Sequence, residues 1–222
     1  MDNAIEVRNV SKQMKNDIIL DDINFTLPVG SIYGITGHNG SGKSMLLRII
    51  TGLVHPSSGD VVVFGQPLGK AVEFAPDTGA LIDVPGFLPR YSGFRNLELL
   101  AMIRRIVGKD EIEDALRKVG LDPHDKRPFR TYSTGMRQRL GIAQAIMEHP
   151  RLLILDEPTR GIDDEGTENI RQLILDLRKQ GMSILITSHF NDELESVCDD
   201  VYVMNRGRLT VGSEKQVTYA PS

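Results

Sequence analysis

The sequence lacks several features that would each assign it to a particular class of protein. It contains one cysteine, Cys198, which excludes an internal disulfide and a cysteine-based zinc site. Its five histidines are scattered and do not indicate a metal cluster. It has 26 basic and 30 acidic side chains, for a formal charge of −4, and the missing basic excess argues against a nucleic-acid partner.

Long apolar runs are also missing. The longest uninterrupted run, residues 99–103, is far short of the roughly 20 residues that a membrane span needs. The opening segment MDNAIEVRNV has no apolar stretch typical of a signal peptide. We therefore expect a soluble protein of a reducing compartment, which contacts a membrane only through a partner.

What remains is the composition of an ordinary globular chain, with 40% apolar and 25% charged residues among 222. This length predicts a single domain, residues 1–222. Apolar segments at 32–36, 152–155 and 183–187 are bounded by turn residues and predict buried strands. Helical patterns between these segments predict an α/β fold with a mainly parallel sheet covered on both faces.

Two regions depart from this strand–helix alternation. The segment IEVRNV near the start, and residues 18–27 and 61–65, have the pattern of shorter strands and predict an antiparallel β flank. Residues 92–148 are mainly helical in pattern and predict a helical subdomain.

A phosphate loop is predicted at residues 37–44, which read GHNGSGKS and match G-x-x-x-x-G-K-[ST] in full. A predicted strand precedes the loop and a predicted helix follows it, as the motif requires. Lys43 would place a positive charge on the β- and γ-phosphates, and the Ser44 hydroxyl would reach Mg²⁺. The alternative is a glycine-rich turn with an exposed lysine. The predicted ATP-binding residues are Gly37, His38, Asn39, Gly40, Ser41, Gly42, Lys43 and Ser44.

A pair of acids ends the apolar segment LLILDE at 152–157. Asp156 stands at the predicted strand end, where it would hold Mg²⁺. Glu157 follows, where it would act as a general base toward an attacking water. The alternative is a helix-capping Asp156 and a solvated Glu157 on a surface loop.

With these motifs, the chain resembles the nucleotide-binding domain of ABC transporters. YSTGMRQRLGIAQAI at 132–146 is similar to that family's signature segment. DEPTRGID at 156–163 resembles its Walker B motif and the D-loop that ends in Asp163. TSHF at 187–190 resembles the segment of the switch histidine, with His189 in that place. These motifs follow the family's order along almost the whole chain.

The resemblance implies the ABC ATPase fold, with a P-loop NTPase core, and a head-to-tail homodimer. Each ATP would lie between the phosphate loop of one copy and the signature of the other, formed by Ser133, Thr134, Gly135 and Met136. His189 would contact the γ-phosphate as a catalytic residue. Without that context, Ser133 is a helix N-cap and His189 a strand-end histidine bonded to backbone.

Three positions depart from the family's pattern. The signature L-S-G-G-Q is represented by Tyr132 to Met136, which keep the serine and the second glycine but lose the first glycine and the glutamine, although Gln138 follows. Met14 stands where an aromatic residue usually stacks on adenine, and its sulfur and methyl group could cover the ring.

The third departure lies in residues 78–97, which resemble the Q-loop region with Asp83 where glutamine is usual. The resemblance gives Asp83 a catalytic role as a ligand of Mg²⁺ or water. The alternative is a loop aspartate without a role. An acid at this position resembles the branch that exports lantibiotics and related peptide antibiotics.

We therefore expect an ATP-binding and ATP-hydrolysing subunit that powers a separate membrane permease, as an exporter of peptide antibiotics or drugs. It would lie peripherally on the inner face of the cell membrane. The docking surface would be residues 84–102, with the anchors Phe87, Leu88, Tyr91 and Phe94, whose alternative role is core packing. Other readings are a non-transport ABC ATPase acting on the ribosome or DNA, and a P-loop kinase or GTPase switch; the signature segment argues against the latter.

Overall fold

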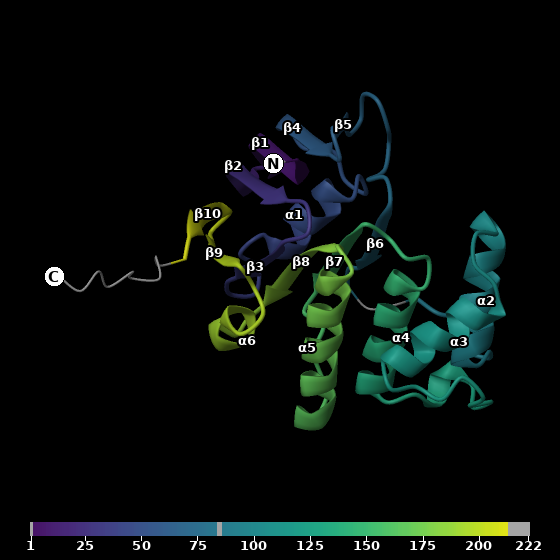
Figure 1. The fold of residues 1–222 in the computed structure, drawn as a ribbon. Helices are drawn as coiled ribbons and strands as arrows, with labels where there is room; N and C mark the ends of the chain where they lie inside the picture. Colours follow the sequence, from purple (N-terminus) through teal and green to yellow (C-terminus); the bar gives the residue numbers. More distant parts are fainter. Residues whose placement is uncertain (1, 84–85, 213–222) are drawn as a thin grey trace, which may run out of the picture.

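The computed structural model describes residues 2–83 and 86–212 (Figure 1). Its strands are β1 (Asn3–Met14), β2 (Asp17–Pro28), β3 (Ile32–Thr36), β4 (Ser58–Val63), β5 (Gln66–Pro67), β6 (Thr78–Leu81), β7 (Leu152–Asp156), β8 (Ser183–Ser188), β9 (Asp200–Asn205) and β10 (Arg208–Val211). Its helices are α1 (Lys43–Ile50), α2 (Gly93–Arg104), α3 (Lys109–Lys118), η1 (Phe129–Thr131), α4 (Thr134–Ile146), α5 (Asp164–Lys179) and α6 (Asn191–Glu195).

The strands form two sheets. One has six strands in the order β10-β9-β3-β8-β7-β6, in which all neighbours are parallel except β10 and β9. The other has four strands in the order β2-β1-β4-β5, paired antiparallel throughout. The predicted α/β class, with a mainly parallel sheet and an antiparallel flank, is confirmed.

Both faces of the six-stranded sheet are buried, as expected for parallel strands. In β7, Leu152 and Ile154 join the apolar cluster beneath α1 and the four-stranded sheet. Leu153 and Leu155 point the other way and join the cluster that contains residues of α4 and α5. All four side chains are fully buried, and burial of each contributes about 1.5–3 kcal/mol. The side chains of β7 therefore alternate between the two faces of the sheet, with α1 on one face and α4 and α5 on the other.

The helices of residues 92–148 lie together at one side of the molecule, where α2 and α3 stand beside α4 and away from the sheets (Figure 1). An aromatic cluster supports them: Phe87 packs edge-on against Phe129 with ring centroids 5.2 Å apart. Phe87 is therefore buried in the core, which is the alternative role given above for the predicted docking anchors. Leu88 and Tyr91, in contrast, remain 49% and 45% exposed. No helix within the described ranges is both long and apolar enough to cross a membrane.

The topology brings four motif-bearing segments to one edge. Because β6, β7, β8 and β3 run parallel, the loops that follow them leave the sheet on the same side. Ligands of open α/β sheets bind at this carboxyl edge.

Candidate functional site

The phosphate loop connects β3 to α1. Gly42 is the N-cap of α1 with φ of 115°, and a Cβ added there would lie 2.8 Å from Leu20 Cδ2. Only glycine fits both the backbone angle and the space. No side chain caps this helix start, so its N-terminal amides and the positive end of the helix dipole remain available to an anion.

Two polar groups of the loop fit a phosphate ligand. The buried Lys43 Nζ donates hydrogen bonds to the carbonyl oxygens of Gly37 at 2.6 Å and His38 at 3.3 Å. Burial lowers the pKa of this ammonium, while the nearby carboxylates of Glu157 and Asp156 oppose that effect. The Ser41 hydroxyl is buried and has no hydrogen-bond partner within the described ranges. Phosphate oxygens would satisfy both groups.

A candidate metal-binding pair lies beside the loop. Ser44 Oγ donates a hydrogen bond to Asp156 Oδ2 at 2.6 Å. A hydroxyl and a carboxylate are oxygen ligands that suit Mg²⁺. Within residues 2–83 and 86–212, no three His, Cys, Asp or Glu side chains gather closely enough to hold a metal by themselves. The ion would therefore depend on Ser44, Asp156 and oxygens of the nucleotide.

The predicted base and the predicted switch histidine are in contact. His189 Nε2 lies 2.5 Å from Glu157 Oε1, and its Nδ1 lies 3.1 Å from the carbonyl oxygen of Gly37. The histidine thus joins the ends of β7 and β8 to the phosphate loop. The Glu157 side chain is 17% exposed, so it is not the solvated loop residue of the alternative reading.

The backbone of Glu157 adopts a left-handed conformation with φ of 49°. A non-glycine residue pays about 1–3 kcal/mol for such a conformation, and it persists where neighbours hold it. Its N–H donates to the Thr187 carbonyl oxygen at 3.2 Å and to Thr187 Oγ1 at 3.1 Å. Its carbonyl oxygen accepts from Gln138 Nε2 at 2.9 Å. The direction of the Glu157 side chain is therefore set from both sides.

Asp83 lies at the same edge, since it follows β6 and β6 pairs with β7 at Leu81 and Leu155. Its carboxylate accepts from Arg48 at 2.5 Å rather than from a residue of the metal-binding pair. Arg48 belongs to none of the sequence motifs described above. Its spacing of four residues from Ser44 places both on one face of α1 and could have indicated the contact.

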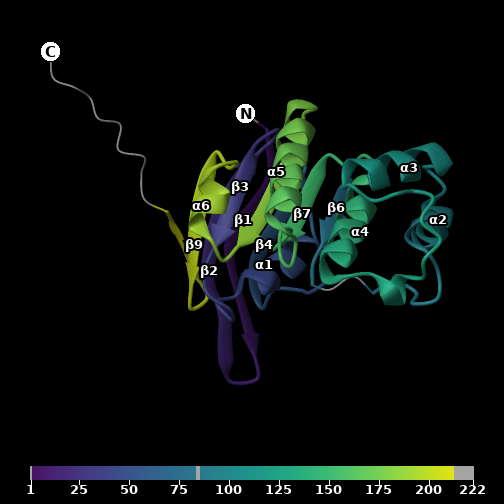
Figure 2. The same ribbon diagram turned by 90° about the horizontal axis from the view of Figure 1, so that it is seen from below.

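Met14 lies at the end of β1, near the tip of the long β1–β2 hairpin, which extends beyond the other strands (Figure 2). Its side chain is 50% exposed. Its contact with adenine stays a prediction.

The signature residues begin α4. Ser133 is the N-cap, and its Oγ accepts from the Met136 N–H at 3.2 Å. Gly135 packs against the D-loop, because an added Cβ would lie 2.9 Å from the Gly161 carbonyl oxygen. Asp163 accepts from Arg139 at 3.1 Å. The signature and D-loop residues line a hollow of about 300 Å³. Within the described ranges, no hydrogen bond joins the signature, residues 133–136, to the phosphate loop, residues 37–44.

Sequence comparison identifies the family and the proteins that this chain resembles. A profile of the ABC transporter family matches residues 20–160. The uncharacterized ABC transporter ATP-binding protein YybJ of Bacillus subtilis (strain 168) is 42% identical, with 96% of this chain and 97% of YybJ covered. The bacitracin transport ATP-binding protein BcrA of Enterococcus faecalis is 39% identical, over 94% and 68%. The lantibiotic transport ATP-binding protein SrtF of Streptococcus pyogenes is 34% identical, over 95% and 90%.

Structural comparison agrees on the fold. The dimeric structure of MJ0796, a bacterial ABC transporter cassette, superposes with a TM-score of 0.84 at 23% identity, over 92% of this chain and 96% of that one. CbiO1 from Clostridium perfringens, part of the ABC transporter complex cbiONQ, gives 0.80 at 27% identity, over 95% and 88%. Profile, relatives and fold therefore agree, and the chain belongs to the ABC transporter family, among its ATP-binding proteins.

Proposed function

We propose that this chain binds ATP with Mg²⁺ and hydrolyses it to ADP and phosphate, and that this reaction powers transport. The observation that carries the proposal is the Glu157–His189 contact of 2.5 Å, beside a loop whose lysine and helix start fit phosphates. A base adjacent to a phosphate site is the arrangement that directs water at a γ-phosphate.

The residues take distinct roles in this proposal. Lys43 and the N-terminus of α1 bind the phosphates, because both direct positive charge at the same loop. Glu157 accepts a proton from the attacking water. His189 exchanges its Nδ1 contact with the Gly37 carbonyl oxygen for a hydrogen bond to the γ-phosphate, as charge develops there. Mg²⁺ would neutralise phosphate charge, held by Ser44 and Asp156, with Asp83 as a further ligand. Met14 would cover the adenine.

We infer that the active form is a head-to-tail homodimer. The signature hollow at Ser133 has no hydrogen bond to the phosphate loop of its own chain within the described ranges. The start of α4 there presents the positive end of a helix dipole. A second copy, placed head to tail, would direct this helix start, Thr134 and Met136 included, at a γ-phosphate, with the Asp163 segment alongside.

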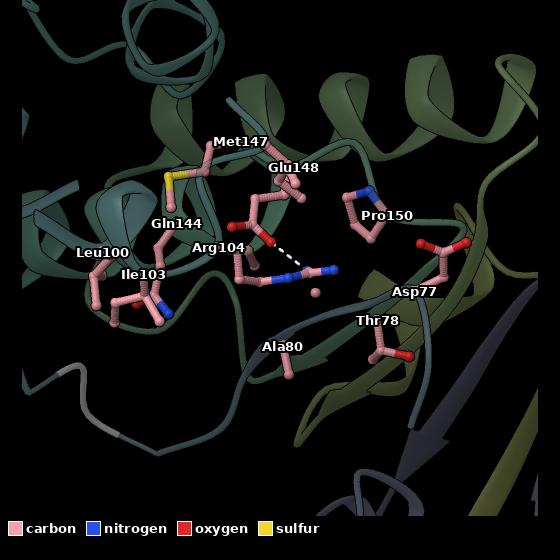
Figure 3. Close-up of a pocket in the computed structure, with 13 residues that line it drawn as sticks. Asp77, Thr78, Ala80, Leu100, Ile103, Arg104, Gln144, Met147, Glu148 and Pro150 are labelled. Carbon is pink, nitrogen blue, oxygen red and sulfur yellow. Dashed lines mark hydrogen bonds and ion pairs between the residues drawn. The ribbon is translucent and has the colours of Figure 1, made fainter. Parts of the chain in front are cut away.

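A membrane permease would be the second partner, bound to the helical subdomain of residues 92–148. A cavity of about 210 Å³ lies between β6, α2 and α4 (Figure 3). The ion pair of Arg104 and Glu148 crosses it, and Ile103 and Ile106 are 76% and 54% exposed at its rim. Such exposed apolar groups beside a charged pair suit an amphipathic helix of a partner. We propose that a short cytoplasmic helix of the permease lies against the exposed Ile103 and Ile106 and inserts one apolar side chain into this cavity. Binding there would be coupled to the site, because β6, which lines the cavity, leads to Asp83.

We infer an exporter of peptide antibiotics or drugs, and hence a role in antibiotic resistance. BcrA and SrtF, whose names refer to bacitracin and lantibiotic transport, support this class. The chain would lie on the inner face of the cell membrane through its permease, without a nucleic-acid partner. Relatives named as transport proteins favour this function over a non-transport ATPase acting on the ribosome or DNA.

The test compares Lys43→Ala with the control Lys70→Ala, since Lys70 is an exposed lysine paired with Asp60. Lys43→Ala should lower ATP hydrolysis by about a hundredfold or more, because the charge on the transferring phosphate is lost. Lys70→Ala should hydrolyse ATP as the unaltered protein does. Thermal melting shows whether each variant is folded. Unaltered turnover in folded Lys43→Ala would refute the assignment.

A further inference from the structure

Thr187 places a hydroxyl directly after the aliphatic run 184–186 of the buried strand β8. β8 reads SILITS, and Thr187 has no exposed surface. In the register of the sheet it stands directly opposite Asp156 of β7. A side chain at this point touches the first of the two acids, and its backbone reaches the second.

The Thr187 hydroxyl bridges the two acids. Oγ1 donates a hydrogen bond to Asp156 Oδ1 at 2.5 Å and accepts one from the Glu157 N–H at 3.1 Å. A hydroxyl has one hydrogen, and an amide can only donate, so these roles are fixed. The other oxygen of Asp156, Oδ2, is left to Ser44.

We propose that Thr187 is a positioning residue that acts through both acids, an inference that rests on the proposed ATPase function. By binding Oδ1, it fixes the rotation of the Asp156 carboxylate, so that Oδ2 faces Ser44 and the metal position. By accepting from the Glu157 amide beside the Thr187 carbonyl oxygen, it helps to hold the left-handed backbone that directs the base at His189. One hydroxyl thereby fixes the position of the metal ligand relative to that of the base.

Valine and serine substitutions separate the hydroxyl from the shape of the side chain. Thr187→Val keeps the branched shape and removes the hydroxyl, whereas Thr187→Ser keeps the hydroxyl. Ser183→Ala is the matched control, because Ser183 is equally buried at the opposite end of β8, where its Oγ accepts from the Gly30 N–H. This control measures how much stability and activity are lost when a buried hydroxyl is removed from β8 at a point distant from Asp156 and Glu157.

Three measurements on the full chain test the inference. The first is kcat against KM for ATP, which should show about a tenfold loss of kcat in Thr187→Val with KM changed little. The second uses Mn²⁺ as a probe of the metal position. The Mn²⁺ concentration at which ATP raises the melting temperature by half of its maximal shift should increase severalfold in Thr187→Val. The third is hydrogen exchange of the Glu157 amide without nucleotide, which should become faster. Thr187→Ser should restore all three, and Ser183→Ala should leave them unchanged.

Two results would overturn the inference. One is a folded Thr187→Val with unaltered kcat, Mn²⁺ response and amide exchange. The other is an equal change in Ser183→Ala, which would show a general effect of strand stability. If the unaltered protein hydrolyses no ATP, the proposed function fails by itself, while amide exchange in Thr187→Val still decides whether the hydroxyl holds Glu157.

Discussion

The carboxyl edge of the six-stranded sheet and the start of α4 both carry motif residues, but they differ in how those residues are held. At the sheet edge, polar side chains from the ends of β7 and β8 and from the phosphate loop bind one another, as Ser44 binds Asp156 and Glu157 binds His189. At the start of α4, the Ser133 hydroxyl bonds, among the described residues, only the Met136 N–H of its own helix turn. Asp163 beside it is bound by Arg139 and has a side chain that is 75% exposed.

This difference indicates that one chain preorganises one side of the nucleotide site and leaves the other side for a second copy. The strand residues that lead to this edge are buried in two apolar clusters, and hydrogen bonds and ion pairs among Ser44, Asp156, Glu157 and His189 hold the polar side chains there. A preorganised base and metal ligand lower the reorganisation that catalysis requires. The exposed signature, in contrast, gains its contacts only on association. The two regions should therefore respond differently to substitution.

The largest effect is expected at the sheet edge. Glu157→Gln keeps the shape of the side chain but removes its capacity to accept a proton, so hydrolysis should fall by about 10²–10⁴-fold. ATP binding should persist, and a dimer should accumulate with ATP and Mg²⁺ in size-exclusion chromatography. Glu113→Gln is the control, because Glu113 is a similarly shielded acid on α3, paired with Arg117. Unchanged turnover and a monomeric Glu157→Gln would contradict both the base and the homodimer.

The sequence predicted much of the sheet edge but few of the side-chain contacts that connect its residues. The motif GHNGSGKS and the strand that ends in Asp156 are local patterns, so a single stretch of residues reveals them. β6 was not predicted, because its four residues, TGAL, contain one large apolar side chain and give no periodic signal. The Arg48–Asp83 ion pair and the Thr187 bridge join residues distant in sequence. Such contacts follow from strand register, which local patterns do not encode.

The start of α4 offers an intermediate effect. Ser133→Ala should reduce hydrolysis about tenfold, because the helix start would then contact a γ-phosphate of the partner copy less well. Nucleotide binding by the monomer should change little. Ser92→Ala is a matched control, since Ser92 is the N-cap of α2 and accepts from the Arg95 N–H at 3.2 Å. Each variant should lose about 1 kcal/mol of stability as a lost cap. An equal loss of hydrolysis in both would reduce Ser133 to a capping residue.

The smallest effect is expected at Asp83, where the sheet edge meets the proposed permease surface. Its ion pair with Arg48 is largely exposed, with side chains 53% and 34% accessible, so breaking it should cost only about 0–1 kcal/mol of stability. If Asp83 is a ligand of Mg²⁺ or water, Asp83→Gln should change the Mg²⁺ dependence of hydrolysis a few-fold and leave ATP binding nearly intact.

Arg48→Gln separates the ligand role from the ion pair. It breaks the same pair but leaves the carboxylate free, so the Mg²⁺ requirement should shift in the direction opposite to that of Asp83→Gln. Asp83→Ala should in addition uncouple hydrolysis from transport, because this loop joins the metal site to the helical region. Mg²⁺ titrations of the ATPase rate for the unaltered protein and the three variants measure these shifts. Superimposable curves, with transport unaffected, would show that Asp83 and Arg48 form only a surface ion pair.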